Sequence, residues 1–150
     1  MRLHQLEAFI TEHNPDVIGI QETKVTDEEF PVAQINSLGY SAYFTGQKTH
    51  YGVALLVKAG LEVKNVFKTF DGADEHAQKR IIGAQIKTTQ GNWVSVINGY
   101  FPQGENRDHA QKFPAKRDFY RDLLDHLERH HSPETAVIVM GDMNISPEDI

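Results

Sequence analysis

The sequence predicts an α/β fold of the α+β kind, in which two β-sheets pack face to face and helices flank them. Two segments with apolar residues at helical spacing lie near the two ends of the chain. Between them come several short segments rich in β-branched and aromatic residues, which are typical of strands. The 150 residues suffice for one domain with a buried core.

The helices are predicted from apolar periodicity and from their end signals. Residues 2–13 form an amphipathic helix that Asn14 and Pro15 end, and its apolar positions are Leu3, Leu6, Phe9 and Ile10. A second helix starts at Pro114, stops before Ser132, and carries an apolar stripe of Phe119, Leu123, Leu124 and Leu127. A short helix is possible within residues 26–38.

The strands are predicted from apolar runs and from the turn residues that bound them. Residues 16–22 read as a buried strand that ends in an acid, Glu22, and an apolar strand starting at Ala136 leads into the GDMN run. The intervening strands look like an antiparallel meander, at residues 40–44, 52–57, 61–67, 80–86 and 92–100. The aromatic side chains expected in the core are Phe9, Tyr43, Phe44, Phe67 and Trp93.

Composition excludes several classes of protein. The net charge of −6 argues against a histone-like nucleic-acid binder, although a local basic face is compatible with it. The absence of cysteine excludes disulfides, a thiolate zinc site and a cysteine nucleophile, and it fits a reducing compartment. No apolar run approaches the roughly 20 residues of a membrane span, and no signal peptide is evident. We expect a soluble, cytoplasmic protein with no membrane partner.

Four polar side chains lie at or just beyond the C-terminal ends of predicted strands: Glu22, Tyr100, Asp142 and Asn144. One sheet edge could gather them around a divalent cation, as metal-assisted phosphoester hydrolysis requires. From spacing alone, ordinary solvated turn residues are the more frequent explanation of such a pattern.

Five segments carry a resemblance to a known family: PDVIGIQETKV (15–25), GQKTHYGVALL (46–56), INGYFPQGENRDH (97–109), KFPAKRDFY (112–120) and VIVMGDMNISPED (137–149). Together they closely resemble the exonuclease III (AP endonuclease) family of the endonuclease/exonuclease/phosphatase superfamily, over nearly the whole chain. The resemblance implies half of a four-layered α/β sandwich, with mixed, mostly antiparallel sheets flanked by helices.

The resemblance also implies that residues 1–150 are a partial domain, which lacks the family's first strand and its C-terminal half. None of the eight histidines stands in the family's late aspartate-histidine context. We therefore expect a fragment that is inactive or weakly active alone. Its uncovered sheet face and edge favour self-association, whereas the full-length enzyme is expected to be monomeric.

The resemblance assigns roles to the strand-end residues. Glu22 matches the family's magnesium-binding glutamate, and Tyr100 matches an active-site tyrosine that donates to, or as phenolate stabilises, the phosphate. Asp142 matches the aspartate that orients and deprotonates the attacking water, and Asn144 matches the amide beside it that holds phosphate and metal. The implied metal ligands are thus Glu22, Asp142 and Asn144, and the cation is Mg²⁺, with Mn²⁺ possible because oxygen ligands suit both.

Arg80 and Gln103 match positions that approach DNA in relatives, where arginine can clamp a phosphate. A solvated role is equally frequent for such residues. The start of the second long helix, with Lys112, Lys116 and Arg117, could also meet DNA. The expected partner is double-stranded DNA with abasic sites or 3′ ends.

The implied function is Mg²⁺-dependent hydrolysis of DNA phosphodiesters, as a 3′–5′ exonuclease and an abasic-site endonuclease in base-excision repair. Two alternatives stay open: a superfamily phosphatase acting on another phosphoester, and a noncatalytic DNA- or partner-binding remnant. His126 and His130 lie one helical turn apart, but no third ligand at a recognisable spacing accompanies them. With His131 they are expected to end a solvated helix face.

Overall fold

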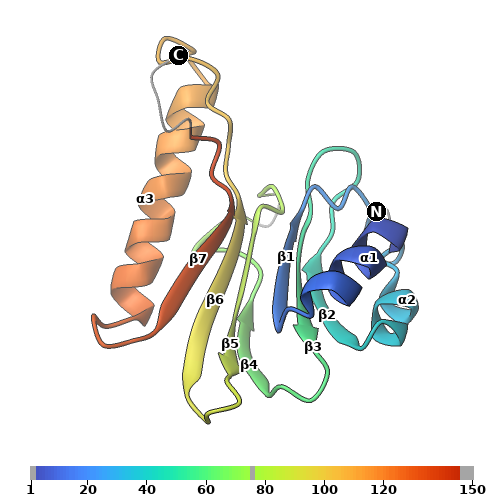
Figure 1. Cartoon of the computed structure of the whole chain (residues 1–150). Coiled ribbons are helices and arrows are strands. Elements are labelled where there is room, and N and C mark those ends of the chain that lie inside the picture. The colour runs from blue at the N-terminus through green and yellow to red at the C-terminus, as the bar shows by residue number, and fades with distance from the viewer. Residues whose placement is uncertain (1–2, 75–76, 146–150) are drawn as a thin grey trace.

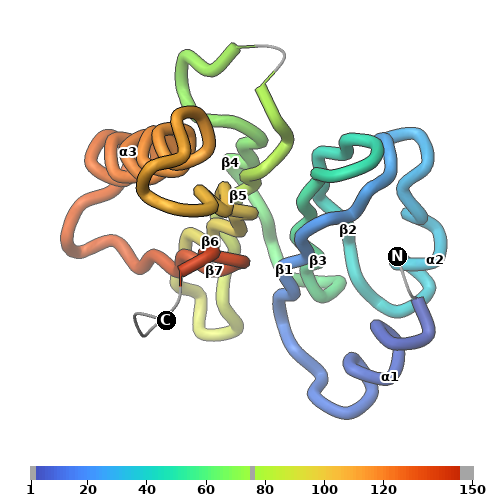
Figure 2. The backbone as a smooth tube through the Cα atoms, turned by 90° about the horizontal axis from the view of Figure 1, so that it is seen from above, coloured from blue at the N-terminus to red at the C-terminus, as the bar shows by residue number. Residues whose placement is uncertain are grey.

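The fold has four layers, which a computed structural model describes for residues 3–74 and 77–145. In Figure 1, α3 covers one outer face, two sheets follow, and α1 and α2 cover the other outer face. The view from above in Figure 2 shows the two sheets side by side between these helices. The predicted sandwich of two sheets flanked by helices is confirmed.

The first sheet has the strand order β1-β3-β2, and both pairs are antiparallel. Its strands are β1 (Val17–Gln21), β2 (Tyr40–Thr45) and β3 (Val53–Lys58). The helices outside it are α1 (Leu3–His13) and α2 (Val32–Ser37). Residue 2, where the first helix was expected to begin, and residues 146–149, the end of the last matching segment, lie outside the described residues.

The second sheet has the strand order β4-β5-β6-β7. It consists of β4 (Val63–Phe67), β5 (Ile81–Lys87), β6 (Trp93–Tyr100) and β7 (Val137–Asp142). The first three strands are antiparallel, and β7 runs parallel to β6 after the crossover through α3 (Lys112–His130). The predicted antiparallel pairing of these strands is confirmed, but the meander is divided between the two sheets, because the chain changes sheets after β3. β3 is the central strand of the first sheet, and its apolar residues are buried on both faces.

The main core lies between the two sheets, where alternate residues of β3 face those of β5 and β6. Every member of this cluster is at most 5% exposed: Val53, Leu55, Val57, Ile82, Ala84, Ile86 and Val96. A second cluster lies beneath α1 and α2, and a third lies beneath α3. Both sheets are therefore anchored on each of their faces.

Three helix positions differ from the sequence prediction. Phe9 is 44% exposed, because α1 rests on its sheet through Leu3, Leu6 and Ile10 and buries no residue fully. Leu124 is 54% exposed, whereas His126 is only 7% exposed. A helix turns by about 100° per residue, so positions three apart lie on nearly the same face and adjacent positions do not. Leu123 and His126 therefore face the sheet, and Leu124 faces away from it. Among the described helices, none is both long and apolar enough to cross a membrane.

Asn98 of β6 joins the two sheets through a fully buried side chain. Its Nδ2 donates to the carbonyl oxygens of Ile20 in β1 and Ala54 in β3, each at 3.0 Å. Its Oδ1 accepts from Nε2 of Gln21 at 2.5 Å. The contact fixes the end of β1, immediately before Glu22, against the end of β6, whose last residue is Tyr100. It therefore places the two predicted site residues at the same edge.

Candidate active site

A hollow of about 550 Å³ opens at this shared edge of the two sheets. We call it the Glu22 hollow, and it is lined mainly by Glu22, Lys24, His50, Tyr51, Gln78, Arg80, Tyr100, Gln103 and Lys112. Three of these side chains are cationic (Lys24, Arg80 and Lys112) and one is a carboxylate (Glu22). The chain as a whole is acidic, so this excess of positive charge is local and suits an anionic ligand.

The turn that carries Glu22 is tied to two other segments. Glu22 and Lys24 both have left-handed backbone angles, with φ of +53° and +57°. The amides of Thr23 and Lys24 donate to the carbonyl oxygens of Gly52 and Tyr51, at 3.1 and 3.0 Å. The amide of Gly52 in turn donates to the carbonyl oxygen of Lys79 at 2.9 Å. These bonds bring Glu22, Tyr51 and Arg80 to one place although they are distant in sequence.

Gly52 is required in this junction. Its φ is +96°, and a Cβ at this position would lie 2.1 Å from Oγ1 of Thr23. We expect Gly52→Ala to lower the free energy of unfolding by roughly 3–4 kcal/mol, through backbone strain and overpacking together. Urea denaturation measures the change.

Gly60 offers a matched control, since its φ is +95° but nothing lies within 4 Å of an added Cβ. Gly60→Ala should lower the free energy of unfolding through backbone strain alone, by roughly 1–2 kcal/mol. Equal losses in the two variants would contradict the tight contact between Gly52 and Thr23.

Glu22 is held by hydrogen bonds to both of its carboxylate oxygens. The Tyr100 hydroxyl donates to Oε1, and Nζ of Lys24 lies 2.6 Å from Oε2. Two hydrogen bonds hold the pKa of the Glu22 carboxyl below its ordinary value. The bond from Lys24 has the larger effect, and the bond from Tyr100 has the next largest. The same bond to Glu22, with burial as the second cause, raises the pKa of Tyr100 to about 12. At neutral pH the pair is therefore a carboxylate and a protonated phenol.

The raised pKa of Tyr100 makes its contribution to stability depend on pH. A group whose pKa is raised on folding stabilises the folded state fully below its unfolded pKa, here 10, and this stabilisation is lost as the pH approaches 12. We expect the stability advantage of the wild-type chain over Tyr100→Phe to shrink between about pH 9 and about pH 11.5. Urea denaturation at both pH values measures it. An advantage that stays constant with pH would contradict the Tyr100–Glu22 bond.

Arg80 lies against two aromatic rings at the wall of the hollow. Its guanidinium carbon is 4.4 Å from the ring centre of Tyr51 and 4.9 Å from that of Tyr100. Its Nε donates to Oε1 of Gln78 at 2.5 Å, and its Nη1 donates to the carbonyl oxygen of Tyr100 at 3.1 Å. The side chain is thus held in place while its charge faces the hollow.

Asp142 and Asn144 lie beside the hollow but do not line it. In the parallel register, Asp142 is paired with Tyr100, and its carboxylate accepts the backbone amide of Asn144 at 3.0 Å. Nδ2 of Asn144 donates to the carbonyl oxygen of Phe101 at 2.8 Å. Gly141 permits this close approach of strands, since a Cβ there would lie 1.9 Å from the carbonyl oxygen of Gly99.

Lys116 connects the two loops next to the hollow. Its Nζ donates to the carbonyl oxygen of Asn144 at 2.6 Å and to that of Gln103 at 3.4 Å. The ammonium of Lys116 thus ties the two loops together, and its contact with DNA stays a prediction. Gln103 itself lines the hollow, as does Lys112.

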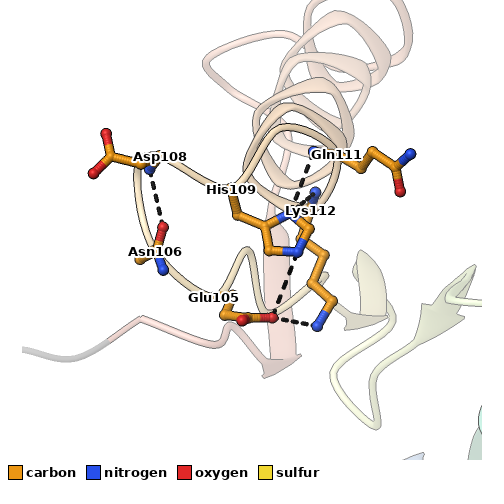
Figure 3. Close-up of polar contacts among 6 residues, drawn as sticks. All are labelled: Glu105, Asn106, Asp108, His109, Gln111 and Lys112. Carbon is orange, nitrogen blue, oxygen red and sulfur yellow. Dashed lines mark hydrogen bonds and ion pairs between the residues drawn. The ribbon is translucent and has the colours of Figure 1, made fainter.

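The loop before α3 is ordered by its own side chains, as Figure 3 shows. Nδ1 of His109 accepts the backbone amides of Gln111 and Lys112, at 3.3 and 3.1 Å, and so satisfies the first turn of α3. Glu105 accepts from Nζ of Lys112 and also pairs with Nε2 of His109 at 3.8 Å. This network holds Lys112 at the rim of the hollow.

The sequence prediction missed Lys24, His50, Tyr51 and Gln78, which line the hollow with the predicted residues. Lys24 is close to Glu22 in the chain, and its role could have been inferred from that proximity. Tyr51 and Gln78 reach the site through backbone bonds between distant segments, Lys24 to Tyr51 and Gly52 to Lys79, for which the sequence has no local signal.

The donor chemistry fits a hard divalent cation. Glu22 and Asp142 offer carboxylates on adjoining strand ends, and Asn144 offers a side-chain amide oxygen. A carboxylate has about four lone-pair positions, so Glu22 retains acceptor capacity beside its bonds to Lys24 and Tyr100. All these donors are oxygens, which Mg²⁺ and Mn²⁺ prefer.

Comparison with known proteins identifies the family. The sequence model of the endonuclease/exonuclease/phosphatase family matches residues 1–150. The chain belongs to this family. An exodeoxyribonuclease III from Haemophilus influenzae is 54% identical over 149 residues, which are 99% of this chain and 55% of that protein.

Solved structures of family members have the same fold. An AP endonuclease from Archaeoglobus fulgidus superposes with a TM-score of 0.82 at 31% identity, covering 98% of this chain and 54% of that chain. A 3′ phosphatase from Neisseria, bound to a product DNA hairpin, has a TM-score of 0.82 at 28% identity, covering 99% of this chain and 55% of that chain. This chain thus spans about half the length of each of these relatives.

Proposed function

We propose that this chain carries metal- and phosphate-binding residues of a Mg²⁺-dependent DNA repair nuclease of the exonuclease III type. Its reactions would be 3′–5′ removal of nucleotides and incision beside abasic sites in double-stranded DNA. The observation that best supports this is the Glu22 hollow, where a carboxylate, a protonated phenol and a ring-stacked arginine meet.

Glu22, Asp142 and Asn144 would hold the cation, as Mg²⁺ or Mn²⁺. When bound, it would polarise a phosphoryl oxygen and offset the negative charge that develops there. The bonds from Lys24 and Tyr100 keep Glu22 ionised for this role, since they hold its pKa below the ordinary value.

The remaining residues would bind the phosphate and handle protons. Tyr100 would act as a hydrogen-bond donor, because its pKa is raised to about 12 in the metal-free chain. Arg80 would clamp phosphate oxygens from the wall of the hollow, with Gln103 and Lys112 contacting the DNA from its rim. Asp142 would take a proton from the attacking water, and Asn144 would fix the loop beside it.

A noncatalytic DNA-binding role is the second candidate, and one observation favours it. Asp142 does not line the hollow, and the Asn144 amide is bonded to the backbone of Phe101. Such an arrangement could bind a phosphate without activating water.

Two measurements on a duplex with one abasic site distinguish these functions. One is the rate of incision and the other is the binding affinity, and each is measured with and without Mg²⁺. Weak Mg²⁺-dependent incision is the expected result, because residues 1–150 are expected to be inactive or weakly active alone. Binding that leaves the duplex uncut and does not change with Mg²⁺ would support the noncatalytic role. Hydrolysis of a phosphate monoester or a phosphoinositide, with the duplex intact, would support a phosphatase of the same superfamily.

A further inference from the structure

A second group of ionisable side chains lies at the far end of α3 from the Glu22 hollow. Asp71, in the connection between β4 and β5, meets His126 and His130 of α3. One ligand atom from each of these three residues lies within 4.8 Å of the others, and we call them the histidine cluster. Ala115 at the hollow and His126 are 11 positions apart on α3, so the two places are about 16 Å apart along the helix.

The contacts within the cluster are close. Nε2 of His130 lies 2.6 Å from Oδ2 of Asp71, and the rings of His126 and His130 are 4.5 Å apart between centres. The cluster borders a hollow of about 250 Å³, which His131 also lines. There is room in it for a cation and water.

His126 is a buried polar side chain that lacks a partner. It is 7% exposed, and its Nδ1 makes no hydrogen bond within the described part of the chain. The ring of Phe67 packs against it at 4.4 Å between centres, and this neighbour offers no acceptor. A buried polar atom without a hydrogen-bond partner destabilises the folded state, so a ligand on this imidazole would remove an unfavourable contribution.

We propose that Asp71, His126 and His130 bind a transition-metal cation such as Zn²⁺, with water in the fourth position. Two imidazoles and one carboxylate are a common ligand set for Zn²⁺, whereas Mg²⁺ prefers oxygen ligands alone. Ligand atoms around tetrahedral Zn²⁺ lie about 3.3 Å apart, so the widest pair must close by about 1.5 Å. The side chains of Asp71 and His130 are well exposed and can supply this movement by torsion.

The protonation states of His126 and Asp71 suit this role. Burial is the main cause that lowers the pKa of His126, and the charge of His130 is the second. The lowered pKa leaves the His126 imidazole neutral at pH 7. The hydrogen bond from His130 lowers the pKa of the Asp71 carboxyl, which keeps it ionised. Neutral imidazole and carboxylate are the forms that coordinate a metal.

A bound cation would attach the β4–β5 connection to the end of α3. Further along the chain, the same connection precedes Arg80, which lines the Glu22 hollow. The site goes beyond the proposed hydrolysis and does not depend on it.

Titration of the chain with Zn²⁺ against a chromophoric chelator, together with visible absorption of the Co²⁺ form, tests the site. The wild-type chain should bind one Zn²⁺ at this site and show the strong absorption of tetrahedral Co²⁺. His130→Gln and Asp71→Asn should each lower Zn²⁺ affinity by about 100-fold and abolish that absorption. Both side chains are exposed, so the fold should persist, and circular dichroism verifies it.

His13→Gln is the matched control, because His13 is also an exposed histidine beside a carboxylate, that of Glu12, at 3.8 Å. It should bind Zn²⁺ like the wild-type chain. Glu22→Gln should also retain Zn²⁺ binding, which separates this site from the proposed Mg²⁺ site. Equal Zn²⁺ affinity in the wild-type, His130→Gln and Asp71→Asn chains would overturn the proposal, as would a Co²⁺ form without tetrahedral absorption.

Discussion

Replacing Asn98 with alanine is expected to lower the free energy of unfolding by roughly 3–5 kcal/mol. The fully buried side chain makes three hydrogen bonds, with Gln21, Ile20 and Ala54, that join β6 to both β1 and β3. Its loss leaves two buried carbonyl oxygens without this donor and opens a cavity between the sheets. Urea denaturation followed by circular dichroism measures the change.

Ser95 provides the control on the same strand. It is also buried, but its Oγ has no hydrogen-bond partner among the described residues. Ser95→Ala therefore removes no bond and should change the free energy of unfolding by less than about 1 kcal/mol. Similar losses in the two variants would mean that Asn98 contributes by volume and not by joining the sheets.

Replacing Glu22 with glutamine is expected to reduce Mg²⁺-dependent incision of an abasic duplex by about 100-fold or more, which corresponds to about 2.7 kcal/mol or more in the activation barrier. Glutamine keeps an acceptor for the Tyr100 hydroxyl but removes the charge that would hold the cation. Single-turnover rates over a range of Mg²⁺ concentrations measure the effect. A rise in the Mg²⁺ concentration needed for half-maximal rate should accompany the loss.

Glu62→Gln is the matched control for this substitution. The Glu62 carboxylate lies 2.6 Å from Nζ of Lys87, the same distance that separates Glu22 from Lys24, but it is remote from the hollow. Its replacement should leave the incision rate unchanged. An equal loss in both variants would show that a surface ion pair, and not the cation site, is responsible.

Strand ends account for how well the sequence predicted the site. Glu22 follows β1 and Tyr100 is the last residue of β6, and the structure joins them by a hydrogen bond because these strand ends meet at one edge. The roles assigned to them, and to Asp142 and Asn144, stay predictions. The two packed sheets flanked by helices followed from the order of the predicted elements and were confirmed.

The parts that the sequence did not predict depend on contacts between distant segments. Tyr51 reaches Arg80 through the bond between Gly52 and Lys79, and Asp71 reaches His130 across 59 positions of sequence. The spacing of residues along the chain predicts neither of these two contacts. This is also why no third residue was expected beside His126 and His130.

Helix orientation explains the remaining differences. The stripe that contains Leu123, Leu124 and Leu127 is wider than the surface that α3 can bury, so one member must face solvent. Periodicity does not determine which member this is, and the structure exposes Leu124 while it buries His126.

The most direct test of the central claim is the position of a bound hard cation, measured by Mn²⁺ relaxation of backbone amide signals in solution NMR. If Glu22 and Asp142 hold the cation, small amounts of Mn²⁺ should broaden the amides around Glu22, Tyr100 and Asp142. This broadening should disappear in Glu22→Gln and persist in Glu62→Gln. Broadening that is unchanged in Glu22→Gln, or that is centred elsewhere, would contradict a metal-dependent phosphoester site in this hollow.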